Sequence, residues 1–241
     1  MPGVWQVRLD SGEVGMWGPR SLHNVVSSWL DERVGGDGGV PHGVNDKPYA
    51  VRGVRRLGAA VSAVEVALLD DGLGEVLVQR AQRGSAAVCG SWTGAVLGVT
   101  MLEHIGWDEL CSVRGEHRWV VRFAETTFRS GAVYSPWPDP VTVITGVHRR
   151  LRLVHPSGFG DLARLRSDSV WVSRCALETV MVDVKAGRRP AVVGEVVYEA
   201  DRGWEGVAEV EKVFRCARFA GVGAHTTHGL GVAQVQASRR R

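Results

Sequence analysis

The order of amphipathic segments constrains the fold of this 241-residue chain more than any other feature of its sequence. Alternation of apolar and polar residues indicates a strand, whereas apolar residues three and four positions apart indicate a helix. In the first half these patterns predict a helix at 21–33, with Ser21 as N-cap, and a helix at 71–83, capped by Asp70. They predict strands at 4–9, 49–54, 61–69 and 92–102. The order of elements is therefore β-α-β-β-α-β.

The second half follows the same order. Its patterns predict helices at 141–151 and 204–217, and strands at 118–123, 170–182, 191–198 and 230–235. The two halves are not visibly alike in sequence, so the architecture repeats and the sequence does not. We therefore expect an α+β fold made of two tandem ferredoxin-like (RRM-like, βαββαβ) domains. The connection near 112–116 divides the chain into an N-terminal domain, 1–113, and a C-terminal domain, 114–241.

Composition and cysteine spacing exclude several other classes. Apolar residues make up 44% and charged residues 23% of the chain, as in ordinary globular proteins, which argues against disorder. No apolar run is long enough to predict a membrane helix, and the N-terminus has no basic head followed by a long apolar stretch, so we expect no signal peptide. The four cysteines are far apart and form no C-x-x-C pair. We therefore expect a cytoplasmic protein without a structural zinc site or a disulfide framework.

Arginine dominates the cationic residues, because Lys47, Lys185 and Lys212 are the only lysines among 29 cationic side chains. The planar guanidinium group matches phosphate oxygens, although a G- and C-rich genome also produces this bias. Arginines gather between 145 and 166 and at the end of the chain, 239–241. Taken singly, each stretch is typical of a solvated surface or tail.

A glycine-rich segment, FAGVGAHTTHGLGVAQV at 219–235, precedes the last predicted strand. Glycine has no Cβ, so such a loop lets backbone N–H groups approach a phosphate closely. The loop follows a helix and precedes a strand, and no Gly-Lys-Thr or Gly-Lys-Ser is present, so it is not a nucleotide-cofactor motif. From composition alone, a tight turn beside a domain boundary explains the segment equally well.

The tandem element order together with GVGAHTTHGLG resembles the Cas6 family, the CRISPR precursor-RNA processing endoribonucleases of the RAMP superfamily. Further resemblance lies in TTFRSGAVYSPWPDPVTV at 126–143 and VVGEVVYEA at 192–200. In the first half, SLHNVVSSWL and PHGVNDKPYAV resemble the family's first helix and the loop that leads into its lysine-proline-aromatic stretch. The resemblance covers nearly the whole chain and is stronger in the second half.

This resemblance implies a metal-independent endoribonuclease that cleaves CRISPR repeat RNA to make mature guide RNA. The ribose 2′-hydroxyl attacks the adjacent phosphate, which leaves a 2′,3′-cyclic phosphate and a 5′-hydroxyl. It implies no cofactor and no membrane association. Repeat RNA is the implied partner, with other CRISPR effector proteins or a second copy of the chain as further options.

The catalytic residues that the resemblance implies are His42, Lys47 and a third group on the first helix. His42 lies in a Gly/Pro loop at the family's catalytic histidine, and an imidazole with a pKa of about 6.5 suits proton transfer near neutrality. Lys47 matches the family's lysine, which stabilises the charge of the phosphorane. Many relatives have a tyrosine on the first helix where this chain has none. His23 and Ser27 share a face there, and we favour His23 because a second imidazole supplies both an acid and a base.

The glycine-rich segment and nearby arginines are the expected RNA contacts. Arg149 and Arg152 are three residues apart and share a helical face, and Arg218 adjoins the glycine-rich loop. Such groups mainly position the phosphate backbone. The other expected contacts are Gly221, Gly223, His225, Thr226, Thr227, His228, Gly229 and Gly231.

Three other interpretations remain open, and one is a ferredoxin-like domain pair of unrelated function, which would make the matches at both ends of the chain chance. A non-catalytic RAMP subunit of a CRISPR effector complex would keep the glycine loop but would not need His42 and Lys47. In a 2H phosphoesterase, His225-Thr226-Thr227 would pair with His155-Pro156-Ser157, although in that family the motif lies within strands. As metal ligands, His225 and His228 would need partners that the segment does not offer, so we expect no metal.

Overall fold

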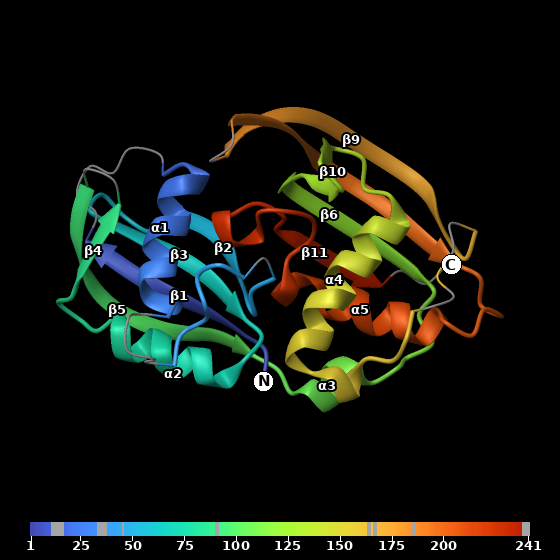
Figure 1. Ribbon diagram of the computed structural model, residues 1–241, viewed down its shortest axis with the longest axis horizontal. Helices are drawn as coiled ribbons and strands as arrows, with labels where there is room; N and C mark the ends of the chain where they lie inside the picture. The colour runs from blue at the N-terminus through green and yellow to red at the C-terminus, as the bar shows by residue number, and fades with distance from the viewer. Residues whose placement is uncertain are drawn as a thin grey trace.

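A computed structural model describes residues 1–10, 17–32, 38–44, 46–89, 92–162, 165, 168–184 and 187–237 (Figure 1). Arg164, Arg166 and the C-terminal arginines at 239–241 lie outside the described residues. The fold is mixed α+β with two larger antiparallel sheets side by side, as the element order predicts. Of the described helices, none is both long and apolar enough to cross a membrane.

The first sheet is formed by the first half of the chain in the order β2-β3-β1-β5-β4. Its strands are β1 (Gly3–Asp10), β2 (Tyr49–Arg56), β3 (Val61–Leu68), β4 (Ala86–Cys89) and β5 (Trp92–His104). Helices α1 (Pro19–Leu30) and α2 (Asp71–Arg80) cover one face of this sheet (Figure 1). Their apolar sides, including Val25, Trp29 and Leu77, are buried in one cluster with Val7, Leu9 and other strand residues.

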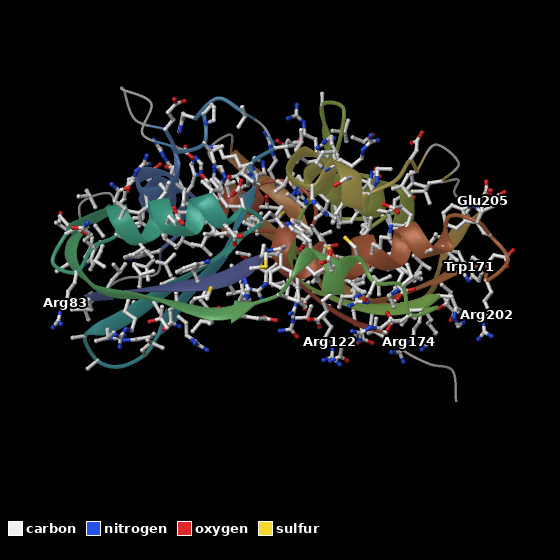
Figure 2. The ribbon with its side chains drawn as sticks, turned by 90° about the horizontal axis from the view of Figure 1, so that it is seen from below. Arg83, Arg122, Trp171, Arg174, Arg202 and Glu205 are labelled. Carbon is white, nitrogen blue, oxygen red and sulfur yellow. The ribbon has the colours of Figure 1, made fainter. Side chains whose placement is uncertain are left out.

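The second sheet has the order β11-β6-β10-β9. Its strands are β6 (Arg118–Thr126), β9 (Val170–Val184), β10 (Gly187–Ala200) and β11 (Ala233–Ala237). Helices α4 (Pro140–Val154) and α5 (Val207–Ala220) cover one face, whereas Arg122 and Arg174 project from the opposite face, where both pair with Glu195 (Figure 2). The four strands take the same spatial order as β1, β2, β3 and β5 of the first sheet.

The two halves share apolar packing. Val4, Ala67 and Leu69 of the first half are buried in the same cluster as Trp119 and Phe214 of the second half. The boundary between the sheets is therefore part of the core. The connection between the halves includes the short helix α3 (Trp107–Cys111).

Some local details differ from the sequence-based expectations. Helix α1 begins at Pro19 after Gly18, so Ser21 lies inside the helix; proline suits a first turn, where its missing N–H is not needed. Asp70 does cap α2, and its carboxylate accepts a hydrogen bond from Gly72 N at 2.8 Å. The short elements α3, β4 and the hairpin β7 (Phe128–Ser130) and β8 (Val133–Ser135) were not expected. They are too short to produce a readable apolar period.

Candidate active site

A pocket of about 870 Å³ lies between the two halves. The first half contributes His23 from α1 and the His42 loop, which we define as residues 38–44 and 46–48. The second half contributes the β7–β8 turn, α4 and the glycine loop, residues 221–231, which contains the short 3-10 helix η2 (Thr226–His228). In Figure 1 this loop reaches from the second half toward α1 and β2. The topology therefore brings the two most informative sequence segments to one place.

The His42 loop is built around a buried carboxylate. Helix α1 ends at Leu30, and Asp31 continues in an extended conformation that pairs with Val40 across the loop. One carboxylate oxygen of Asp31, Oδ2, accepts hydrogen bonds from His42 Nδ1 and Lys47 Nζ, both at 2.6 Å. The other, Oδ1, accepts a hydrogen bond from the Tyr49 hydroxyl at 2.8 Å. The two predicted catalytic groups of this loop thus share one anchor.

The two groups differ greatly in exposure. The His42 side chain is 72% exposed, whereas that of Lys47 is 4% exposed. Both line the pocket. An ammonium group has three N–H donors, so the contact with Asp31 leaves Lys47 further donors. The exposed His42 ring is accessible to a large ligand, whereas the buried Lys47 ammonium places a positive charge in the wall of the pocket.

His23 connects α1 to the glycine loop. Its Nδ1 donates a hydrogen bond to the Thr227 carbonyl at 3.2 Å, and its ring stacks on that of His228 with centroids 3.9 Å apart. The centroids of the His23 and His42 rings are 6.2 Å apart. Burial lowers the pKa of His23 below 6.5, and the bond to Thr227 offsets this only in part. Ser27, the other option on this helix, does not line the pocket and donates to the Asn24 carbonyl.

Four glycines of the glycine loop hold backbone conformations that residues with a Cβ rarely adopt. Gly221, Gly223, Gly229 and Gly231 all have positive φ, between 69° and 85°. A Cβ at Gly231 would lie 2.0 Å from the Val222 carbonyl oxygen, which is closer than any real contact. Backbone bonds from Ala224 N to Thr127 O (2.7 Å) and from Gly231 N to Glu125 O (3.0 Å) tie the loop to the end of β6. The glycines are therefore required by the close approach of backbone to backbone.

His225 is the one described non-glycine residue with positive φ, at 59°. Its Nε2 shares a hydrogen bond of 3.2 Å with the Tyr134 hydroxyl, and the two rings stack. Burial, followed by the positive charges of Arg129 and Arg189, lowers the pKa of His225. Its imidazole is therefore predominantly neutral at neutral pH and contributes shape and hydrogen bonding to the pocket.

Two neighbouring arginines on α4, Arg149 and Arg150, differ in burial and in the part of the site that they contact. Arg150 is buried and donates hydrogen bonds to the carbonyls of Gly223 (3.1 Å) and Gly221 (2.6 Å), and burial lowers its pKa to about 10. Arg149 is exposed and makes two hydrogen bonds to Asp46 of the His42 loop, at 2.7 and 3.0 Å. Arg150 thus supports the glycine loop from inside, and Arg149 links α4 to the His42 loop across the pocket.

Most of the predicted site residues line the pocket. They are His23, His42, Lys47, Arg149, Gly223, His225, Thr226, Thr227 and His228. Arg152 is exposed on α4 outside it, and Arg218 lies over the Phe219 ring and pairs with Glu103. Gly221, Gly229 and Gly231 shape the loop without lining the pocket.

Sequence reasoning missed Asp31, Arg129, Tyr134 and the internal role of Arg150. Arg129 and Tyr134 lie within the segment 126–143 that carries the family resemblance. That resemblance is the signal that could have identified them. The 2H pairing gains no support, because His155 stacks on Trp107 and does not line the pocket with His225. Among the described residues, no group of three or more His, Cys, Asp or Glu side chains is placed to hold a metal ion.

Comparison with known proteins gives consistent matches. A family model described as CRISPR-associated endoribonuclease Cas6 matches residues 121–233. A product complex of a Thermus Cas6, TTHA0078, is 25% identical with a TM-score of 0.78, covering 98% of this chain and 99% of that chain. A product complex of Thermus thermophilus Cas6 TTHB231 is 21% identical with a TM-score of 0.80 and the same coverage. No curated protein matches significantly.

A more distant likeness concerns the fold alone. A Cas6-related protein from Pyrococcus furiosus is 11% identical with a TM-score of 0.57, covering 98% of this chain and 99% of that chain. The matching structures therefore extend over both halves, whereas the match to the family model lies entirely within the second half.

Proposed function

We propose that this chain, which belongs to the Cas6 family of CRISPR-associated endoribonucleases, cleaves CRISPR repeat RNA into mature guide RNA without a metal ion. The observation that carries the proposal is the pocket in which His23, His42 and Lys47 face the glycine loop. In the proposed reaction the ribose 2′-hydroxyl attacks the adjacent phosphate, leaving a 2′,3′-cyclic phosphate and a 5′-hydroxyl. This transesterification needs a base, an acid and positive charge for the phosphorane.

The two imidazoles divide the proton transfers. His23 is predominantly neutral at neutral pH because burial lowers its pKa, and its Nδ1 proton is engaged by the Thr227 carbonyl. Its Nε2 therefore has a free lone pair and takes the proton of the 2′-hydroxyl. His42, with its ring centroid 6.2 Å away, gives a proton to the departing 5′ oxygen. At this separation both rings can contact the same phosphodiester linkage from one side of the pocket.

Lys47 supplies positive charge to the phosphorane. Its Nζ has one N–H directed at Asp31, and its remaining donors are available to a non-bridging phosphate oxygen. The base, the acid and the cation are then all side chains of the chain itself, which supports a reaction that proceeds without a metal ion. Because Lys47 is buried, the effective dielectric constant around its ammonium group is low, and its attraction to the charge of the phosphorane is stronger than it would be in water.

The glycine loop and the arginines bind the RNA backbone. Gly223, Thr226 and Thr227 present small or hydroxyl-bearing surfaces to the pocket, and His225 and His228 add imidazole groups. Arg149 contacts phosphate in the pocket, while Arg152 and Arg218 extend the basic surface beyond it. Gly221, Gly229 and Gly231 keep the backbone in the shape that these contacts need.

The same proposal includes the division into two ferredoxin-like units, 1–113 and 114–241. The equal spatial order of four strands in each sheet supports this division. RNA then lies between the units, and one unit contributes the reactive groups while the other contributes the loop that holds the phosphate.

The test is cleavage of end-labelled repeat RNA, taken from the CRISPR arrays of the encoding genome, in the presence of EDTA. We expect a single cut with a 2′,3′-cyclic phosphate, and no cut when the ribose at the cleavage site is 2′-deoxy. His42→Ala should abolish cleavage and preserve RNA affinity. Tight binding without any cut would instead indicate a non-catalytic subunit of an effector complex. Light scattering on the free and RNA-bound protein would show whether it acts as a dimer.

A further inference from the structure

Among the described residues, the carboxylate of Asp31 is the acidic group that contacts both predicted reactive residues of the His42 loop. Burial alone would raise the pKa of Asp31, but hydrogen bonds from Lys47, Tyr49 and His42 outweigh it and hold that pKa below its ordinary value. The group is therefore ionised at neutral pH. An ionised carboxylate can only accept hydrogen bonds, so the proton in each of its three contacts belongs to the partner.

The backbone around Asp31 is held from several sides. Val40 N donates to the Leu30 carbonyl at 2.8 Å, and Glu32 N donates to the Val40 carbonyl at 2.7 Å, one on each side of Asp31. Arg80 Nη1 donates to the Asp31 carbonyl at 2.6 Å. A Cβ at Gly39 would lie 2.6 Å from the Asp31 backbone, so the loop closes over this residue at glycine distance. The carboxylate therefore has a fixed position.

We infer that Asp31 is a positioning residue that keeps a proton on Nδ1 of His42 and so makes Nε2 the only atom of that ring that exchanges protons with RNA. The inference rests on the proposed function and adds to it the residue that orients the ring. The distance of 2.6 Å from Nδ1 to Oδ2 is that of a charge-assisted hydrogen bond. In free histidine the neutral ring prefers its proton on Nε2, so this tautomer has to be imposed by the carboxylate.

The same oxygen also fixes Lys47. His42 and Lys47 both donate to Oδ2, which places the exposed imidazole and the buried ammonium on adjacent sides of one atom. Tyr49 occupies the other oxygen and prevents the carboxylate from rotating. Asp31 therefore sets the distance between the proton donor and the cation that act on one phosphate.

The first test needs neither RNA nor a variant of Asp31. Ring ¹⁵N chemical shifts of the intact protein distinguish the two neutral tautomers, and loss of the signal in His42→Ala assigns it. We expect the Nδ1–H form for neutral His42. Finding the Nε2–H form would overturn the inference, whether or not the protein cleaves RNA. Failure of the cleavage assay with an Nδ1–H ring would instead count against the proposed function alone.

The second test is Asp31→Asn, with Glu32→Gln as the matched control. The control removes an adjacent negative charge on an exposed side chain. In Asp31→Asn the single-turnover rate at saturating RNA should fall by up to about 100-fold, because a small misplacement of a reacting group has an effect of this size. The RNA dissociation constant should not rise, because the Asp31 side chain is only 5% exposed. Glu32→Gln should keep both values.

A third variant covers the case in which Asp31→Asn does not fold, since it strands the buried ammonium of Lys47. Tyr49→Phe removes one hydrogen bond to Oδ1 and leaves both contacts at Oδ2. We expect it to reduce the rate less than Asp31→Asn and to broaden or shift the His42 Nδ1 signal. A folded Asp31→Asn with an unchanged rate and an unchanged tautomer would contradict the positioning role.

Discussion

The His42 loop and the glycine loop face each other, but they are stabilised in opposite ways. In the His42 loop an ionised carboxylate, Asp31, holds an exposed imidazole and a buried ammonium. In the glycine loop the imidazoles are half-buried and are held by ring stacking on His23 and Tyr134. Backbone hydrogen bonds and positive-φ glycines fix its path. One wall of the pocket is organised by charge and the other by shape.

This difference separates two tasks. Proton transfer needs an accessible ring whose two nitrogens have distinct roles, and a buried carboxylate provides that distinction. Binding a phosphate needs a surface that does not rearrange, and backbone packed against backbone provides that surface. Substitutions in the His42 loop should therefore change the reaction rate, whereas those in the glycine loop should change stability and RNA affinity.

The largest expected effect comes from replacing one histidine in each loop by alanine. His42→Ala should reduce the single-turnover rate about 10²–10⁴-fold, the usual contribution of a general acid or base, with little change in RNA affinity. His225→Ala should change affinity more than rate, because its ring, which contacts the Tyr134 hydroxyl, is proposed to bind the RNA backbone. The measurement is cleavage at saturating RNA combined with filter binding. Equal losses of rate in both variants would remove the distinction between the loops.

The next largest effect tests the shape of the glycine loop. Gly231→Ala combines left-handed strain, about 1–3 kcal/mol, with a clash against the Val222 carbonyl. Gly84→Ala is the control, because Gly84 also has positive φ but a Cβ there would meet nothing within 4 Å. Chemical denaturation should show a clearly greater loss of unfolding free energy in Gly231→Ala. Similar losses in the two variants would mean that the loop is not held by close backbone contact.

A smaller effect compares neighbouring arginines. Arg150→Met removes the donor to the half-buried Gly223 carbonyl and strands the buried Gly221 carbonyl, which costs about 1–3 kcal/mol. Arg149→Met removes only an exposed ion pair, which contributes about 0–1 kcal/mol. Thermal melting should place Arg150→Met well below Arg149→Met. The reverse order would show that the glycine loop does not depend on Arg150.

The smallest effect is the position of the lower limb of the pH–rate profile. The base form of His23 is the neutral one, so the rate should rise as pH increases through the pKa of His23. Because burial lowers that pKa, the midpoint should lie below 6.5. Single-turnover cleavage rates between about pH 5 and 8, the range in which histidine titrates, measure this midpoint. A midpoint above 6.5 would assign the base role to another group.

Periodic apolar residues made the main elements predictable. Val25, Trp29 and Leu30 mark the buried face of α1, and Ile144, Val147 and Leu151 mark that of α4. Elements such as α3 and the β7–β8 hairpin escaped prediction because three to five residues do not complete an apolar period. The start of α1 was misjudged because serine is a typical N-cap residue, so Ser21 was taken as the cap, whereas the helix already begins at Pro19.

The candidate site was predictable only where residue type and family resemblance coincided. His42, Lys47 and His23 were named from the sequence, and the structure places them in one pocket. Asp31 has no sequence signal, because the helix was predicted to continue to residue 33 and an aspartate near a helix end is usually a surface residue; the helix in fact ends at Leu30. Its burial depends on the bridge to Val40, which no local pattern reveals. Arg150 was likewise indistinguishable from its neighbours until the packing of α4 was known.

The apolar cluster shared by Val4, Ala67, Leu69 and the second half has a consequence for how this protein can be manipulated. Separating the chain near residue 113 would expose these side chains to water, so neither fragment should fold stably and remain unaggregated alone. Complementation of two separately produced fragments would then require them to assemble during folding. The spacing between the two walls of the pocket is therefore established when the polypeptide folds.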